Sequence, residues 1–493
     1  MKKLFVLCLL SSVFCPLSFC YGEWFTTEWS KFRGNPQNTG YTQELITPPL
    51  APAWQFNTGG AIISSPAIAN GIIYIGTRDS ALYAVSSSSG NLIWMCKTQG
   101  WIDGTPVIGN QKVYFTSRDG YLYALRATDG KIQWMYRTNG INCSSPLIVG
   151  KRLFFGAGFP CTDIYCLYSD NGMKLWNKSF KQPVYSSPCY MDNVIFIGAN
   201  DGKFYALNPD GSIKWSVSTA GGVYFSSPVV GDSFVYCVPG DYDKKAYALN
   251  KETGTIKWVN SLGSKDIGHY ISSATLLRVS EDMANKIVTS SPYSYVSSPA
   301  LDRATLYVCS GYPTLSIYAL DIYNGNLKWQ KEIGKASDIG FCSSPIITDT
   351  IVWVGSGSGI LYAFSALTGD SLWAFSLGSP IISSPAFANG SIYVATQGGK
   401  ITCFSSGGSK NSTTEVEEID LLPKVFKLYK SYPSPFTHST LIQYQIPMDR
   451  ERKITIPCQL KIYNSAGQLV RTLVDKKQES GYYHITWDGK DNI

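Results

Sequence analysis

A short anchor sequence repeats about every 40 residues, and no other feature constrains the fold as strongly. The anchor is Ser-Ser-Pro or a close variant, and successive prolines are mostly 40 to 42 residues apart, with one interval of 46 and one of 71. The anchor prolines are Pro66, Pro106, Pro146, Pro188, Pro228, Pro299, Pro345 and Pro385. Such a period is typical of repeat proteins in which each unit buries its apolar face against its neighbours.

A tryptophan recurs in register with the anchor, and seven of the eight copies follow a glycine by four residues. The recurring tryptophans are Trp54, Trp94, Trp134, Trp176, Trp215, Trp258, Trp329 and Trp373. We expect each tryptophan on the outer strand of its unit, packed against the next unit, because a large aromatic side chain contributes most when it is buried.

Each unit has the pattern of four short strands. After Pro106, apolar runs are separated by turn sequences at Gly109-Asn110 and Asp119-Gly120 and by a turn that ends at Gly130. Turns of this kind between alternating apolar runs indicate β-hairpins. Four strands in about 40 residues is the size of a propeller blade. We therefore predict an all-β fold with an eight-bladed β-propeller over residues 50–406.

The two ends of the repeat region are predicted to meet in one blade. Trp54 precedes the first anchor, and no such tryptophan follows the last anchor. The N-terminal segment around Trp54 is therefore expected to complete the eighth blade beside residues 401–404. This pairing closes the ring and removes open sheet edges, which invite aggregation.

Several units resemble a known family. Residues 124–134, Ala-Leu-Arg-Ala-Thr-Asp-Gly-Lys-Ile-Gln-Trp, resemble the repeat motif of quinoprotein-like propellers, also called PQQ-type repeats. Residues 248–258, 319–329 and 363–373 match similarly, and residues 29–40 resemble the lead-in segment of such propellers. The resemblance covers about residues 29–406. The family contains quinone-dependent dehydrogenases and non-enzymatic scaffolds, among them the propeller lipoprotein of outer-membrane assembly.

The residues that the dehydrogenases need are missing from the sequence. Those enzymes use two adjacent cysteines over the quinone and a bound calcium ion, whereas none of the 13 cysteines here is adjacent to another. Only His269 of the three histidines lies in the propeller region. Asp241 and Asp243 are better explained by a hairpin turn than by a calcium loop, because Ca²⁺ needs six to eight oxygen ligands. We predict a protein that is not an enzyme, with no catalytic residue, cofactor or metal.

The 71-residue interval contains about 30 extra residues, at 262–295. This insertion includes His269, Tyr270, Tyr293 and Tyr295, which makes it a candidate loop for binding a partner, since loops on a rigid scaffold often carry recognition. A structural elaboration of the blade is an equally good interpretation.

The N-terminus has the features of a secretory signal peptide over residues 1–22. Lys2 and Lys3 precede an apolar run at residues 4–10, and small residues follow. This run is too short to span a bilayer, and no later segment is predicted to be transmembrane. Cys20 leaves lipidation open as an alternative. Residues 23–49 then form the lead-in segment.

The C-terminal part is predicted to be a separate module. Residues 407–423 have the composition of a linker, and residues 424–493 contain short alternating strands. Residues 432–436, 462–468, 471–474 and 487–489 resemble the C-terminal sorting domain of the type IX secretion system and the immunoglobulin-like domain of flagellar hook-capping proteins. We expect a small immunoglobulin-like β-sandwich that lacks the final strand of its family, either because the sequence is truncated or because the domain has decayed and no longer directs export.

Three functions remain open from the sequence. The first is a secreted or cell-surface scaffold that binds a protein, cell-surface or outer-membrane partner. The second is a periplasmic scaffold for outer-membrane protein assembly, and the third is a quinone-dependent dehydrogenase. The net charge of +7 is spread along the chain, so no nucleic-acid partner is expected. We expect a monomer, in which Cys161 and Cys166 either form a disulfide or remain single buried residues.

Overall fold

The computed structural model shows an all-β protein in which every regular element of the described residues is a strand. The described residues are 29–219, 221–223, 226–239, 245–262, 297–310, 315–334, 343–406, 427–428, 440–446, 456–464, 468–478 and 481–490.

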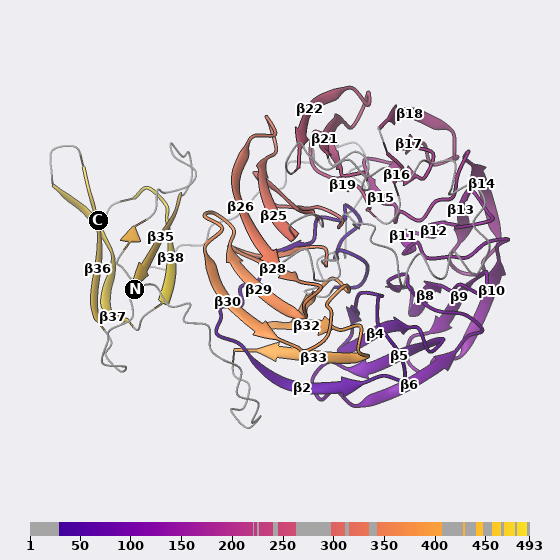
Figure 1. Ribbon diagram of the computed structural model, residues 1–493, viewed down its shortest axis with the longest axis horizontal. Coiled ribbons are helices and arrows are strands. Elements are labelled where there is room, and N and C mark those ends of the chain that lie inside the picture. The colour runs from indigo at the N-terminus through magenta and orange to yellow at the C-terminus, as the bar shows by residue number, and fades with distance from the viewer. Residues whose placement is uncertain are drawn as a thin grey trace, which may run out of the picture.

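Eight sheets are arranged around a central axis, and in six of them the four strands follow chain order from the axis outward (Figure 1). Blade 1 contains β3 (Ala67–Ala69), β4 (Ile72–Thr77), β5 (Ala81–Ser86) and β6 (Leu92–Lys97). Blade 2 contains β7 (Val107–Gly109), β8 (Lys112–Thr116), β9 (Tyr121–Arg126) and β10 (Ile132–Arg137). Blade 3 contains β11 (Leu147–Val149), β12 (Arg152–Gly156), β13 (Asp163–Tyr168) and β14 (Lys174–Ser179). Blade 4 contains β15 (Cys189–Met191), β16 (Val194–Ala199), β17 (Lys203–Leu207) and β18 (Ile213–Ser218).

The second half of the ring repeats this arrangement. Blade 5 contains β19 (Val229–Val230), β20 (Phe234–Cys237), β21 (Lys245–Asn250) and β22 (Ile256–Ser261). Blade 6 contains β23 (Ala300–Leu301), β24 (Thr305–Ser310), β25 (Leu315–Asp321) and β26 (Leu327–Gly334). Blade 7 contains β27 (Ile346–Thr348), β28 (Ile351–Gly355), β29 (Ile360–Ser365) and β30 (Ser371–Ser376), with β1 (Tyr41–Thr42) parallel to β27.

The eighth blade is built from both ends of the propeller, which confirms the predicted closure of the ring. It contains β31 (Ala386–Ala388), β32 (Ser391–Ala395) and β33 (Lys400–Ser405), with β2 (Ala51–Asn57) as its outer strand. The register pairs Trp54 with Cys403, and Figure 1 shows the indigo β2 beside the orange β33.

The hydrophobic core is divided among the seams between blades. One cluster of buried side chains joins each blade to the next, as with Phe115 of blade 2 and Leu82 of blade 1. A second example joins Phe155 of blade 3 to Leu122 of blade 2. Because each blade buries both faces of its sheet, the middle strands are apolar throughout, as the burial of β16 illustrates.

The C-terminal module is a small two-sheet structure. One sheet contains β34 (Lys427–Leu428), β35 (Thr440–Ile446) and β38 (Gly481–Trp487), and the other contains β36 (Ile456–Tyr463) and β37 (Leu469–Gln478). Tyr444 and Ile446 from the first sheet pack against Val474 from the second. This packing of two antiparallel sheets over a shared core is that of an immunoglobulin-like β-sandwich.

Candidate functional site: the channel axis and its rim

The anchors form a chain of hydrogen bonds around the axis. The backbone N–H of Thr105 donates to the hydroxyl of Ser145 at 2.9 Å, and the N–H of Ser145 donates to Ser187 in the next blade at 2.9 Å. The same bond links five further pairs of adjacent blades: Ser65–Thr105, Ser187–Ser227, Ser227–Ser298, Ser298–Ser344 and Ser384–Ser65. The serine or threonine before the proline is therefore explained by the hydrogen bond that its hydroxyl accepts from the anchor of the preceding blade.

Residues 29–42, which we call the axial segment, follow the channel and pair with one blade after another. Backbone carbonyls of this segment accept hydrogen bonds from inner-strand N–H groups of six blades. These pairs are Trp29–Ile68, Ser30–Ile108, Pro36–Tyr190, Gln37–Val230, Thr39–Leu301 and Gly40–Ile347. The inner strand of a blade is an open sheet edge, and buried edge donors need a partner. The axial segment supplies that partner.

Three polar side chains of the axial segment are buried at the axis. Lys31, Arg33 and Asn38 are 4%, 1% and 1% exposed, respectively. Nδ2 of Asn38 donates to the carbonyls of Pro188 at 3.4 Å and Pro228 at 3.2 Å. In this way one side chain connects the inner strands of blades 4 and 5.

Arg33 connects the next two blades in the same manner. One guanidinium nitrogen donates to the carbonyl of Pro299 at 2.9 Å and another donates to the carbonyl of Pro345. Gly40 lies against this guanidinium, and a Cβ at Gly40 would overlap it. Lys31 Nζ donates to Oδ1 of Asn38 at 2.7 Å, so these two side chains are joined directly, and the Arg33 charge lies close enough to influence Lys31.

Burial changes the acid–base behaviour of both cations. The pKa of Lys31 is lowered from 10.5 to about 7, mainly by burial; Cys189 opposes the change, and the nearby Arg33 charge adds to it. Burial also lowers the pKa of Arg33, from 12.5 to about 9. The backbone carbonyls around the axis compensate these charges in part, because their oxygens carry partial negative charge.

A compact charged cluster lies on the rim that carries the connections from outer to inner strands. Asp103 accepts from Nε of Arg78 at 3.1 Å and forms an ion pair with Nη2 of Arg118 at 2.6 Å. Both guanidinium carbons lie over the ring of Trp101, at 4.7 and 5.1 Å from its centroid. Arg78 belongs to blade 1 and Arg118 to blade 2, so the cluster links these two blades.

The side chains of the cluster are less than 10% exposed. Burial alone raises the pKa of Asp103, but the two arginines outweigh burial and hold that pKa below its ordinary value of 3.8. The cluster therefore carries one net positive charge on this rim, held in a fixed geometry.

The described thiols have the environment of structural cysteines. Six of the nine described cysteines are buried, and all nine are free thiols. Burial raises the pKa of Cys143 and of Cys403 to about 11, so neither forms a thiolate nucleophile near neutral pH. Cys161 and Cys166 are not joined. Cys166 lies in the core, and Cys161 Sγ lies 3.5 Å from the Tyr165 hydroxyl.

The structure places the recurring tryptophans at the seams. The indole N–H of Trp134 donates to the carbonyl of Ser169 in blade 3 at 3.2 Å, and a Cβ on Gly172 of that blade would lie 2.5 Å from the Trp134 ring. Trp54, Trp94, Trp176, Trp215, Trp258 and Trp329 make the corresponding bonds to the next blade. Trp373 instead packs edge-on against Phe404 at 5.7 Å.

The candidate partner loop and the possible calcium ligands cannot be placed. His269, Tyr270, Tyr293, Tyr295, Asp241 and Asp243 lie outside the described residues. Within the residues that are described, no group of three or more His, Cys, Asp or Glu side chains is arranged to hold a metal ion. No helix in that part of the chain has the length and hydropathy needed to cross a bilayer.

Sequence reasoning missed the polar residues that converge at the axis and the rim. Lys31, Arg33 and Asn38 occur once in the chain and not in each repeat, so the period does not mark them. Asp103 did carry a signal, because it is a charged residue where other anchors have Ile63, Cys143 or Ile382.

Comparisons with known proteins agree with this architecture. Residues 51–159, 161–339 and 313–411 match the family described as outer membrane protein assembly factor BamB, and residues 455–493 match the FlgD Ig-like domain. Tetrathionate hydrolase of Acidithiobacillus ferrooxidans is 23% identical over 49% of this chain and 47% of that protein. Outer membrane protein assembly factor BamB of Moranella endobia is 23% identical over 48% of this chain and 68% of that protein. The chain thus spans about half the length of the hydrolase.

Solved structures show the same fold at low sequence identity. BamB from Moraxella catarrhalis superimposes with a TM-score of 0.57 at 16% identity, over 74% of this chain and all of that one. Quinohemoprotein alcohol dehydrogenase from Comamonas testosteroni gives 0.64 at 16% identity, over 82% of each chain. The fold is therefore shared by a protein named as an assembly factor and by one named as a dehydrogenase.

Proposed function

The chain belongs to the family of the outer membrane protein assembly factor BamB, and on this premise we propose that it is an exported scaffold that binds protein partners at the outer membrane. We propose further that it is not an enzyme. Its rigid, closed ring presents two rims of loops and turns, which is the usual place for recognition on a propeller. The immunoglobulin-like module at the C-terminal end is proposed to serve delivery to the cell surface.

The observation that carries the proposal is the occupation of the channel by the chain itself. Arg33 and Asn38 bind four of the carbonyls that begin the inner strands, and the axial segment pairs with six blades. Buried thiols with raised pKa values add to this, since nucleophilic chemistry needs a thiolate or another activated group.

The fixed charge on the rim supports a partner with acidic groups on its surface. The Arg78–Asp103–Arg118 cluster holds one positive charge between blades 1 and 2; because its charged side chains are less than 10% exposed, this charge acts on a partner through its field, and the half-buried Trp101 offers the contact surface. Aromatic and arginine side chains are enriched in the energetically important parts of protein interfaces.

Deletion and complementation in the source bacterium test the assembly function. We expect loss of the full chain to reduce the amount of folded outer-membrane β-barrel proteins, and wild-type protein to restore it. A tagged full chain should co-purify with a component of the assembly machinery from the outer-membrane fraction. Unchanged levels of all outer-membrane proteins would contradict the proposal.

Enzyme assays separate the scaffold from its enzymatic alternatives. The purified full chain, supplied with calcium and quinone, is expected to show no dye reduction with alcohols or sugars, and no hydrolysis of tetrathionate. Turnover with either class of substrate would contradict the non-enzymatic assignment.

A single substitution tests how the protein is held in the envelope. If Cys20 carries a lipid, Cys20→Ser should move the protein from the membrane fraction to the soluble fraction. If the signal peptide is simply removed, the substitution should leave the distribution unchanged.

A further inference from the structure

Five of the seams share one hydrogen-bond motif. A tyrosine from the second strand of one blade and the recurring tryptophan from its outer strand donate to the same backbone carbonyl of the next blade. The tyrosine–tryptophan–carbonyl sets are Tyr74–Trp94–Ala127, Tyr114–Trp134–Ser169, Tyr236–Trp258–Ile322, Tyr307–Trp329–Ala366 and Tyr393–Trp54–Ser87. The tyrosine hydroxyl proton is therefore used for the bond between blades.

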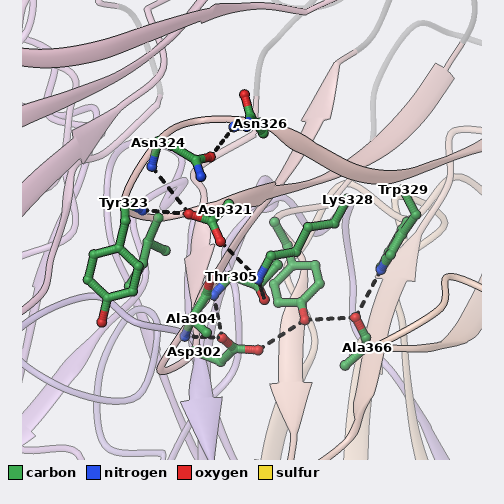
Figure 2. A network of polar contacts seen from close by, with 12 residues as sticks. Asp302, Ala304, Thr305, Asp321, Tyr323, Asn324, Asn326, Lys328, Trp329 and Ala366 are labelled. Carbon is green, nitrogen blue, oxygen red and sulfur yellow. Dashed lines mark hydrogen bonds and ion pairs between the residues drawn. The ribbon is translucent and has the colours of Figure 1, made fainter. Parts of the chain in front are cut away.

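The seam between blades 6 and 7 adds a carboxyl group to this motif. Figure 2 shows Asp302 linked through a tyrosine side chain to the carbonyl of Ala366, which Trp329 also contacts. Asp302 Oδ2 lies 3.0 Å from Oη of Tyr307, and that Oη lies 3.0 Å from the Ala366 oxygen. In blade 2 the position that corresponds to Asp302 is Gly109.

The other oxygen of Asp302 is committed to the turn before β24. Its Oδ1 accepts from the N–H of Ala304 at 2.8 Å and from the N–H of Thr305 at 2.6 Å. Any proton on this carboxyl group must therefore reside on Oδ2, the oxygen that faces Tyr307.

The proton count at Tyr307 depends on the state of Asp302. A tyrosine hydroxyl has one proton to donate. If Asp302 is ionised, the carboxylate and the Ala366 carbonyl compete for that proton, and a charged acceptor forms the stronger bond. If Asp302 is protonated, it donates to Tyr307 Oη, and the Tyr307 hydroxyl directs its own proton to the Ala366 carbonyl.

We propose that Asp302 is a proton-operated latch between blades 6 and 7, which strengthens the bond from Tyr307 to Ala366 when protonated and weakens it when ionised. The device adjusts the strength of one seam to the pH around an exported protein. It is independent of the proposed scaffold function, because it concerns how the ring is held together.

The charged surroundings set the direction of the titration. Burial, the largest influence, raises the pKa of Asp302 above its ordinary value of 3.8, although the bonds to Ala304, Tyr307 and Thr305 and the Lys328 charge oppose the change. Lys328 is itself held by the carbonyl of Ala304 at 2.8 Å and by Asp321 at 3.7 Å. Tyr41 is a further titratable neighbour, because it interacts electrostatically with Asp302 and also with Arg303 and Asp349.

The sign of the effect follows from the raised pKa. A carboxyl group whose pKa is higher in the folded than in the unfolded state stabilises the fold in its protonated form. This stabilising contribution is complete when the pH is below the ordinary pKa of aspartate. It is lost as the pH rises through the higher pKa that Asp302 has in the folded state. The seam should therefore be tightest at acidic pH, below the ordinary aspartate pKa of 3.8, and should loosen as the pH rises.

Asp302→Asn tests the latch, because the side-chain amide can donate to Tyr307 permanently while its oxygen keeps the two backbone bonds. We expect amide hydrogen exchange around Ala366, corrected for its intrinsic pH dependence, to rise by up to about tenfold across the titration in the wild type, since one hydrogen bond contributes at most about that factor. In Asp302→Asn the corrected exchange should stay slow at every pH.

Two further variants keep the test decisive. Tyr307→Phe should give fast exchange at this seam at low and high pH alike, because the shared donor is gone. Tyr114→Phe should weaken the seam between blades 2 and 3 without any pH dependence. A wild-type seam that is insensitive to pH, or an Asp302→Asn seam with the same pH course as the wild type, would overturn the proposal.

Discussion

The outer seams and the channel axis hold the same eight blades in different ways. At the seams the contact is repeated: a tryptophan of one blade fits against a glycine of the next and donates to a nearby carbonyl, as Trp134 does with Gly172 and Ser169. At the axis the anchor bonds also repeat, but the axial segment adds contacts that are made once, by Arg33 and Asn38, each of which connects two blades.

This difference shows which contacts between blades are repeated around the ring and which are made by a single element. A seam of this kind is one of seven similar joints, and its loss affects mainly the two blades that share it. The axial segment is a single element common to six blades, so a change there acts on blades that are far apart in sequence. The following substitutions compare the two, from the largest expected effect to the smallest.

Trp134→Ala should have the largest effect, about 3–4 kcal/mol in the free energy of unfolding, the lower part of the range for deleting an aromatic side chain, because Trp134 is partly buried in its seam. The substitution removes the ring that packs on Gly172 and the bond to Ser169. Denaturant unfolding of the full chain measures it. Ile132→Ala on the same strand is the control, because Ile132 is 49% exposed and should contribute less than about 0.5 kcal/mol. Equal effects of the two substitutions would contradict the seam account.

Arg33→Met should destabilise the protein by about 3 kcal/mol, since two bonds from a charged donor to buried carbonyls are lost, at about 1.5–3 kcal/mol each, against some relief from burying a charge. Arg33→Lys is the matched control, because lysine keeps the charge but cannot reach both carbonyls with one planar group. Its stability should lie between those of the wild type and Arg33→Met. A neutral Arg33→Met variant would show that the axial bonds contribute little.

Gly172→Ala should cost about 2–3 kcal/mol, because the added Cβ meets the Trp134 ring at 2.5 Å and the backbone is left-handed, with φ of 73°. Gly150→Ala separates the two causes, since Gly150 has φ of 58° but open space where the Cβ would be. The control should cost only about 1 kcal/mol, the cost of the backbone conformation. Melting curves of both variants measure these losses of stability, and an equal loss in the two would contradict the packing of Trp134 on Gly172.

The seams could be predicted from the sequence because their contacts repeat. The glycine–tryptophan spacing occurs seven times, and the closure of the eighth blade follows from the offset between Trp54 and the last anchor. The structure adds the reason for the spacing, which is that the tryptophan of one blade fills the space above the glycine of the next.

The contacts of the axial segment could not be predicted because they occur once and join distant residues. Arg33 is 266 residues from Pro299 and 312 residues from Pro345, and nothing in the local sequence of either proline indicates a partner. Asp302 is similar: an aspartate at the end of a strand suggests a turn, and only the neighbouring blade reveals the competition for the Tyr307 proton.

Ser145→Ala should have the smallest effect of the series, about 1 kcal/mol, because it removes one acceptor and leaves the N–H of Thr105 without that bond. Ser145→Thr is the control, since a threonine already occupies the same place in blade 2 as Thr105. The threonine variant should unfold at the same denaturant concentration as the wild type. A loss in Ser145→Thr as large as that in Ser145→Ala would mean that packing, and not the hydroxyl, matters there.

Native-state hydrogen exchange tests most directly whether the axial segment is an integral part of the ring. The relevant amides donate to its carbonyls from six blades: Ile68, Ile108, Tyr190, Val230, Leu301 and Ile347. If the segment and the blades form one unit, these amides should exchange as slowly as the amides of the middle strands β8 and β16, because both then exchange only through global unfolding. Fast exchange of these six amides, with the middle strands still protected, would show that the segment detaches from an intact ring and would contradict the account.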